Sequence, residues 1–291
     1  MRTLALVVVV WAAALVAAAA GFLPALVRVR RAVVVRVVGA HVTTEVWSVP
    51  VDGGRARLVL RDRGHQDAFP VYRNDGSLLF VRPTSLTTTA LFSLRGGHVT
   101  RLRRLPVFAP LAYSPALDEL ALPRGRTLQA ETPNGRVVRT LARVSATTIP
   151  AWSADGTTLV YSHVVRTPVN RYQPELVVVR GGRTRIVPVG FVGSIAVSPT
   201  GDRVVFELAR RLVLLDLVTG RRRVLAGNVS SPVWSPDGRT VAAGDARGIL
   251  LVDVRTGRRR RGPAKAAGVS FAPDGRALVY TRLYAAQSMP K

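Results

Sequence analysis

Residues 231–242 read SPVWSPDGRTVA: a short apolar run ends at Trp234, a Ser-Pro-Asp-Gly turn follows, and a second apolar run begins. Asp-Gly between two such runs is a strong signal for a β-hairpin, because Gly tolerates a positive φ angle and the Asp side chain hydrogen-bonds its own backbone. The stretch therefore predicts two antiparallel strands joined by a tight turn.

The same unit recurs along the chain. Five further copies lead into an apolar run and begin at Tyr72, Tyr113, Trp152, Val197 and Phe271. With Trp234, the six anchors are spaced by 41, 39, 45, 37 and 37 residues. Self-similarity near 40 residues with strand-type alternation is typical of the blades of a β-propeller. We find no helical periodicity after residue 27, which argues against a helical repeat of the same length.

A second kind of hairpin alternates with the first. Its Gly-containing turns fall at residues 52–54, 96–97, 134–135, 181–182, 219–220 and 256–257. Each blade would thus have strands A and B joined by the first kind of turn and strands C and D joined by the second. The first C–D hairpin, residues 45–60, precedes every A–B hairpin, and the last A–B hairpin, residues 267–281, has no C–D hairpin after it. We predict an all-β, six-bladed propeller over residues 43–291, closed by pairing of these terminal hairpins.

Composition limits the chemistry. The 291 residues are 48% apolar and fit one large all-β domain with a short leader. The absence of Cys excludes disulfides, thiolate chemistry and Cys-ligated metal. A net charge of +25 favours anionic partners such as lipid headgroups, acidic polymers or an acidic protein face. Biased codon usage would produce the same excess of Arg without function. Nucleic acid is a weaker option, because the Arg clusters are not interleaved with aromatic residues.

The chain begins with an uncharged stretch, residues 3–27, long enough to cross a hydrocarbon core of about 30 Å as a helix. Three Ala residues at 18–20 have the character of a signal-peptidase site. Residues 1–27 are therefore a cleaved signal peptide or a signal anchor. We favour the anchor, since the apolar run continues past the candidate cleavage point. Residues 28–42 then form a basic linker, whose charges would by themselves favour a cytoplasmic C-terminal domain.

Three Arg clusters, at residues 101–104, 221–223 and 258–261, fall in or beside strand D. Strand D is the outer edge of a blade, and charge on an exposed edge blocks pairing with other molecules. We interpret the clusters in this way; an anion-binding belt is the alternative.

The repeat resembles that of the TolB-like six-bladed propellers. The similarity is closest at residues 234–238, WSPDG, and 271–275, FAPDG, and it extends to Pro70, Pro150 and Pro232, each two residues before the aromatic. Two copies depart from the pattern: Tyr113 is followed by no Asp-Gly, and Val197 replaces the aromatic. The resemblance implies an extracytoplasmic propeller of the cell envelope that binds a lipoprotein or other envelope protein. It does not carry over contact residues, because the motif is structural in every blade.

Propellers bind through the face where the D–A and B–C loops meet, because loops carry function on a rigid scaffold. The longest B–C loop is predicted at residues 162–174, SHVVRTPVNRYQP, and we expect specificity there. The polar triplet at residues 65–67, His-Gln-Asp, is interpreted most simply as a solvated loop. The candidate partner-binding residues on this face are His65, Asp67, Phe108, His163, Arg166, Arg171, Tyr172 and Asn228.

These observations favour a non-catalytic, envelope-located binding protein that is membrane-tethered or secreted and needs no cofactor. No two of the four His have metal-ligand spacing, so no metal site is predicted. One alternative is a propeller enzyme that uses His65, Asp67 and His163 on an anionic polysaccharide or a lactone-like substrate. Another is an electrostatic binder of acidic surfaces, whose affinity would fall steeply with salt.

Overall fold

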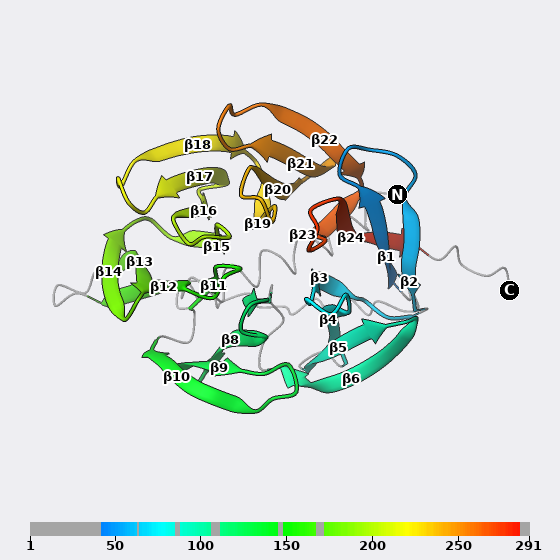
Figure 1. Cartoon of the computed structure of the whole chain (residues 1–291), viewed down its shortest axis with the longest axis horizontal. Helices are drawn as coiled ribbons and strands as arrows, with labels where there is room; N and C mark the ends of the chain where they lie inside the picture. The colour runs from blue at the N-terminus through cyan, green and yellow to red at the C-terminus, as the bar shows by residue number, and fades with distance from the viewer. Residues whose placement is uncertain are drawn as a thin grey trace, which may run out of the picture.

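A computed structural model of the chain describes residues 42–285 except 63, 85–87, 106–110, 145–147 and 167–171. The leader 1–27 and almost all of the linker 28–42 therefore lie outside the described residues. In the described part, six four-stranded antiparallel sheets stand around a central axis (Figure 1). The prediction of an all-β, six-bladed propeller is confirmed.

Each blade has four strands, named A to D from the axis outward. Blade I contains β3 (Ala68–Tyr72), β4 (Leu78–Pro83), β5 (Thr89–Arg95) and β6 (His98–Leu105). Blade II contains β7 (Tyr113–Ser114), β8 (Glu119–Arg124), β9 (Thr127–Glu131) and β10 (Val137–Arg143). Blade III contains β11 (Pro150–Trp152), β12 (Thr158–Arg166), β13 (Tyr172–Arg180) and β14 (Arg183–Pro188).

The remaining three blades follow the same plan. Blade IV contains β15 (Val192–Val197), β16 (Arg203–Leu208), β17 (Arg211–Asp216) and β18 (Arg222–Gly227). Blade V contains β19 (Ser230–Trp234), β20 (Thr240–Asp245), β21 (Gly248–Asp253) and β22 (Arg259–Ala264). Blade VI contains β23 (Ala266–Phe271), β24 (Ala277–Ala285), β1 (Val42–Pro50) and β2 (Arg57–Arg61).

Blade VI joins the two ends of the described chain. Its strand order is β2-β1-β24-β23, and β1 pairs with β24 along its whole length, from Val42 opposite Ala285 to Pro50 opposite Ala277. Val42 and Ala285 consequently lie side by side at the face that carries the D–A and B–C loops, which we call the loop face.

The Ser-Pro-Asp-Gly turn is held by its own side chains. In blade V, the Ser235 hydroxyl donates to Asp237 Oδ1 (2.5 Å), which also accepts the Arg239 N–H (3.0 Å). Ser235 Oγ in turn accepts the N–H of Thr240 at 2.9 Å. Gly238 has a φ of +66° and closes the turn. Ser, Asp and Gly each have a separate structural task, which is why the motif repeats without marking a functional site.

The irregular turn of blade II is stabilised by its neighbour. Asp118, one position after the place that Gly occupies in the other turns, lies in the left-handed region at φ +50°. Its carboxylate accepts the Tyr113 hydroxyl (2.7 Å) and the guanidinium of Arg73 in blade I (2.6 and 3.0 Å). These contacts offset the cost of a non-Gly residue with positive φ.

The aromatic anchors pack between blades. Trp234 lies in a core cluster with Val205 and Leu225 of blade IV, and its indole N–H donates to the backbone oxygen of Ala196 at 3.1 Å. The anchor therefore fastens one blade to the preceding one as well as filling the core.

The Arg clusters of the outer strands also form hydrogen bonds between neighbouring blades. Arg222 in β18 donates to the backbone oxygen of Pro188 in blade III (2.6 Å), and the next residue, Arg223, donates to that of Val254 in blade V. The pattern repeats 37 residues later: Arg259 reaches back to Leu225 (2.6 and 3.1 Å), and Arg260 reaches forward to Val51. Adjacent Arg side chains thus bridge a blade to both of its neighbours.

Candidate functional site on the loop face

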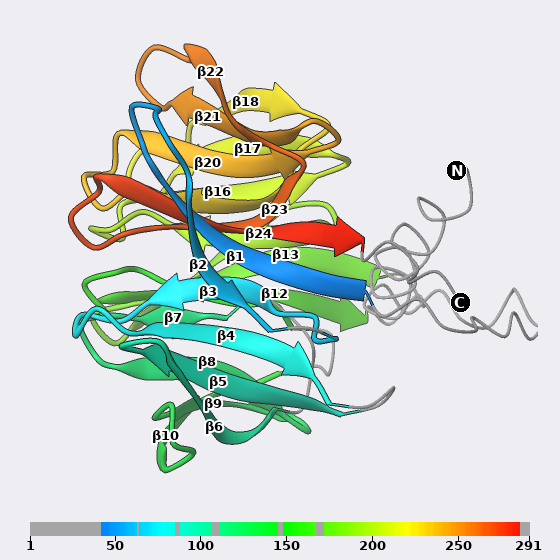
Figure 2. The ribbon, with the colours of Figure 1, turned by 90° about the vertical axis from the view of Figure 1, so that its right-hand side faces the viewer.

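A hairpin of blade III extends from the loop face. Strands β12 and β13 have nine residues each and pair continuously from Thr158 opposite Arg180 to Arg166 opposite Tyr172. The predicted loop at residues 162–174 is therefore mostly strand, and only residues 167–171 lie between the two strands. We call residues 162–166 and 172–174 the arm. Figure 2 shows the ends of β12 and β13 on the same side of the molecule as the free ends of β24 and β1.

The arm contains several of the predicted residues. His163 lies opposite Glu175 in the ladder, and its Nδ1 is 2.9 Å from Glu175 Oε1. Arg166 is the last residue of β12, and Tyr172 opposite it is 61% exposed. Arg171 lies outside the described residues, as does the side chain of Arg166.

A second aromatic residue lies beside the arm. The D–A loop that leaves blade III is tied to β13 by a hydrogen bond from the Val189 N–H to the backbone oxygen of Pro174 (3.2 Å). Two residues further on, Phe191 is 45% exposed. Tyr172 and Phe191 are the two exposed aromatic side chains of the described part of the chain. Aromatic side chains contribute strongly to protein interfaces, and Tyr172 with Phe191 forms what we call the aromatic pair.

Asp67 is buried, with 1% of its surface exposed, so the interpretation of a solvated loop is wrong for this residue. Its carboxylate accepts hydrogen bonds from Arg82 Nε (2.6 Å) and Nη2 (3.1 Å), and its backbone N–H donates to Thr44 Oγ1. The Arg82 guanidinium also lies 4.6 Å from the ring centre of Phe92 and 5.5 Å from that of Phe80. Burial raises the pKa of Asp67, although the Arg82 contact acts to lower it. The ion pair of Asp67 with Arg82 links the D–A loop that enters blade I to the interior of that blade.

The two candidate histidines are not brought together. His65 is exposed in blade I, with Nδ1 3.1 Å from Asp62 Oδ1, and Asp62 in turn accepts from Arg82. His163 is in blade III, so blade II separates the two rings (Figure 1). Each histidine has its own carboxylate, and the Asp67 carboxylate faces Arg82. The geometry does not assemble these three side chains around one reacting atom.

Asn228 lies in the D–A loop between blades IV and V. Its φ is +54°, its N–H donates to the backbone oxygen of Arg210 (2.6 Å), and its side-chain oxygen accepts from Arg210 Nε (3.3 Å). These bonds give Asn228 a structural task, because Asn tolerates the left-handed region that this loop requires. Phe108 lies outside the described residues.

Sequence reasoning missed a partly buried chain of polar residues that links blades IV and V. The Ser194 hydroxyl donates to Glu207 Oε2 (3.2 Å) and accepts the N–H of Ser231 (3.2 Å) from the next blade. Burial raises the pKa of Glu207, partly offset by the Ser194 hydrogen bond and the nearby Arg210 charge. No motif surrounds these residues, so nothing in the sequence marked them. Within the described ranges, no group of three or more His, Asp or Glu is placed to hold a metal ion.

Comparison with known proteins gives the fold alone. No protein-family model matches the chain, and no curated protein matches its sequence. A chain in the crystal structure of a nidogen/laminin complex superposes with a TM-score of 0.59 at 12% identity, over 82% of this chain and 98% of that one. The β-propeller domain of the Trilobed protease from Pyrococcus furiosus, which has an open velcro topology, gives a TM-score of 0.50 at 11% identity. This second similarity covers 77% of this chain and 76% of that one.

The part of the chain that the structure describes contains no helix with the length and apolarity needed to cross a lipid bilayer.

Proposed function

We propose that the chain is a non-catalytic binding propeller that engages a protein partner through the arm and the aromatic pair. The observation that carries the proposal is the exposure of Tyr172 and Phe191 beside a hairpin that extends from a rigid ring. Exposed aromatics on such a support bind at low entropic cost, because the backbone is already ordered.

The polar candidates support binding over catalysis. His163 and His65 each pair with their own carboxylate, and both oxygens of Asp67 are engaged by Arg82. A catalytic group needs free access to substrate in a shared geometry. The enzyme alternative therefore receives less support from the contacts of these residues than the binding proposal does.

We place the protein in the cell envelope, tethered or secreted through residues 1–27, in line with its resemblance to TolB-like propellers. Because β1 begins at Val42 on the loop face, a tether would enter the propeller on the side of the arm. The expected partner is then an envelope protein or lipoprotein that approaches close to the membrane surface.

Site-specific photo-crosslinking tests the proposal. p-Benzoylphenylalanine replaces Tyr172 or Phe191 in the full chain, expressed in its native cells. Val218, in the C–D turn of blade IV on the opposite face, provides a matched control because it is 75% exposed. We expect a discrete adduct from positions 172 and 191 and none from 218.

Equal adducts from all three positions, or none from 172 and 191, would contradict the proposed surface. The enzyme alternative has its own test: His65→Ala, which lies outside the arm, should leave the adduct intact, and the non-catalytic proposal fails if the parent, but not this variant, turns over an anionic polysaccharide.

A further inference from the structure

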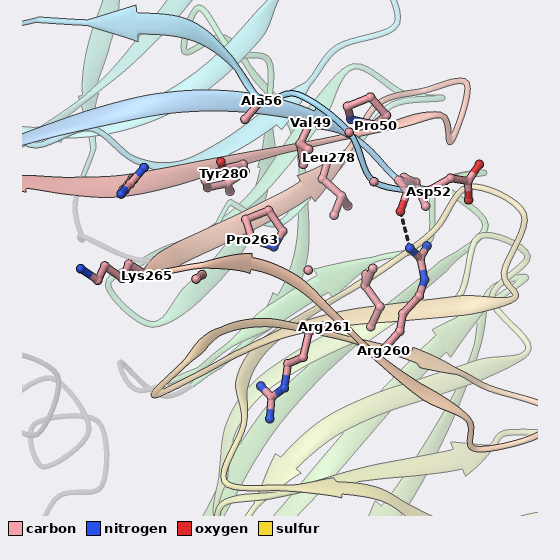
Figure 3. A pocket seen from close by; sticks show the side chains of 17 residues that line it. Val49, Pro50, Asp52, Ala56, Arg260, Arg261, Pro263, Lys265, Leu278 and Tyr280 are labelled. Carbon is pink, nitrogen blue, oxygen red and sulfur yellow. Dashed lines mark hydrogen bonds between the residues drawn. The ribbon is translucent and has the colours of Figure 1, made fainter.

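A groove separates blades V and VI on the side of the ring. It has a volume of about 490 Å³ and is lined on one wall by β1 and β24 and on the other by β22 (Figure 3). Its lining includes Val49, Leu251, Leu278 and Tyr280, all of them buried core residues. We call it the seam groove. Volumes of about 300–1,000 Å³ are typical of small-molecule sites.

The outer strand beside the groove lacks a core side chain that other blades have. Three other outer strands carry an Arg that contacts the next blade. Two positions after this Arg, each of them has a buried Leu or Val: Leu105 after Arg103, Val187 after Arg185, and Leu225 after Arg223. In β22 the corresponding residue after Arg260 is Gly262, followed by Pro263 and Ala264. The side chain that fills the other interfaces is missing here, and the core residues behind it face the groove.

The end of the groove nearer the loop face is cationic. Lys265 and Arg282 both line it, and they are close together because Ala266 pairs with Arg282 in the sheet. Both side chains are exposed, and neither forms an ion pair with an acid in the described part of the chain. Figure 3 shows Lys265 and Tyr280 towards one end and Arg260 with Asp52 at the other.

The acids near this end are already engaged. Glu45 lies opposite Arg282 in the ladder, but it accepts from Arg61 (2.5 Å) and from the Trp47 indole (2.8 Å). Strand β22 adds two cations to the lining: Arg260 donates to the backbone oxygen of Val51, and Arg261 is paired with Asp245. Lys265 and Arg282 therefore remain to attract an anion at the end of the groove nearer the loop face.

The wall formed by β1 and β24 favours a ligand recognised by side chains over a peptide that adds a strand; the open backbone edge at the groove is that of β22, the outer strand of blade V. Strand β24 is hydrogen-bonded to β23 and β1, and β1 is bonded to β24 and β2, so both edges of each are occupied. A peptide that extends a sheet needs a free backbone edge. The wall formed by β1 and β24 provides apolar surface and positive charge instead.

We propose that the seam groove binds a single-chain anionic amphiphile, with its acidic head at Lys265 and Arg282 and its alkyl chain along Tyr280, Leu278 and Val49. The head is a carboxylate, as in a long-chain fatty acid, or a phosphate, as in a lysophospholipid. This site is distinct from the arm and does not depend on the partner proposed for it.

Photoaffinity labelling tests this assignment. The full chain, in nanodiscs of phosphatidylcholine, is incubated with a hexadecanoate that carries a diazirine in its alkyl chain. Tryptic peptides then locate the label. We expect it in residues 248–255 and 277–282, which contain Leu251 and Tyr280. Label spread evenly over the outer strands would overturn the proposal.

Matched variants separate charge from shape. Lys265→Glu with Arg282→Glu should reduce labelling about tenfold, since two attractive charges become repulsive. Arg255→Glu with Arg258→Glu makes the same change of charge at two exposed Arg outside the lining and should leave it unchanged. Ala56→Phe should reduce labelling by filling the groove. The neutral variant Lys265→Gln with Arg282→Gln covers the case in which the Glu variant does not fold.

Competition identifies the head group. Unlabelled hexadecanoate or lysophosphatidylglycerol should displace the probe, and the stronger of the two shows whether carboxylate or phosphate is preferred. Hexadecanol, which has the same chain without a charge, should compete at least about tenfold less well. Equal competition by hexadecanol, or equal labelling of the Glu variant and its control, would refute the anion site.

Discussion

Arg260 in the outer strand of blade V donates a hydrogen bond from Nη1 to the backbone oxygen of Val51 in blade VI, although 209 positions separate them in the chain. Arg223 makes the equivalent contact with Val254 one blade earlier. The Arg-rich outer strands thus connect neighbouring blades through charge-assisted bonds to backbone oxygens, which are shorter and stronger than neutral ones.

Replacing Arg260 by Ala should lower the free energy of unfolding by about 1 kcal/mol, because an exposed charge-assisted hydrogen bond contributes roughly this much. Urea denaturation measures the change. Arg258→Ala, which removes a neighbouring exposed Arg, is the control and should be near neutral. If Arg260 served only to protect an edge, the variant would aggregate without a loss of unfolding free energy.

The buried pair of Asp67 and Arg82 predicts a large and pH-dependent effect. Arg82→Ala leaves a buried carboxylate without its partner and should destabilise the protein by about 3–5 kcal/mol at neutral pH. Burial already raises the pKa of Asp67. A folded-state pKa above the unfolded one means that ionised Asp67 costs stability as pH rises, so the penalty should shrink on acidification towards pH ~4.

Thermal unfolding of the Arg82→Ala protein at a series of pH values checks this expectation. The double variant Asp67→Leu with Arg82→Met removes both charges and should be more stable than Arg82→Ala alone. A penalty independent of pH, or a double variant no better than the single, would show that the loss comes from packing.

Acid sensitivity should reside in the turn carboxylates. Burial alone would raise the pKa of Asp237, but hydrogen bonds from Ser235 and the Arg239 N–H lower it below its usual value. Its contribution to stability is therefore present above the unfolded pKa of about 3.9 and is lost as pH falls through the folded value. Asp237→Asn keeps the acceptor oxygen and removes the titration.

The melting temperature of Asp237→Asn should thus fall less steeply than that of the parent between about pH 5 and pH 2. Asp52→Asn, at an exposed turn carboxylate that accepts no hydrogen bond among the described residues, is the control. Parallel curves for all three proteins would exclude a role of this turn in acid unfolding.

Two glycines of the A–B turns distinguish backbone strain from contact between blades. Gly76 and Gly201 both have positive φ, at +78° and +70°. A Cβ on Gly76 would meet open space, whereas one on Gly201 would lie 2.1 Å from Thr158 Oγ1 in blade III. Gly76→Ala should cost about 1 kcal/mol, and Gly201→Ala about 1–3 kcal/mol more. Urea denaturation measures both losses of unfolding free energy. If the two losses are equal, Thr158 in blade III moves aside at no cost in stability.

Much of the architecture could be predicted from sequence because turns are local. The Asp-Gly and Gly-containing hairpins depend on residues a few positions apart, and the structure places strand pairs at each of the six repeats. The site was harder to predict. Asp67 and Arg82 are in separate segments, and only their pairing in three dimensions shows that Asp67 is buried.

The conformation of the arm was also beyond prediction from local sequence. Residues 162–174 lengthen one repeat, and an insertion without strong β periodicity was predicted as a loop. Cross-strand contacts such as His163 with Glu175 extend the ladder instead. Gly262 gave no signal, because a Gly in an outer strand does not by itself show which residues of the neighbouring strands and blade it leaves uncovered.

The pairing of β1 with β24 also constrains the order in which the blades can fold. Strands β1 and β2 precede the other described strands along the chain, but β1 can pair with β24 only after β24 has been synthesised. Until then, the backbone groups of β1 that later bond to β24 stay open to mispairing, and contacts so distant in sequence are slow to form. A circularly permuted gene that encodes β24 and β1 in succession would make this step local, and we expect it to refold faster than the natural order.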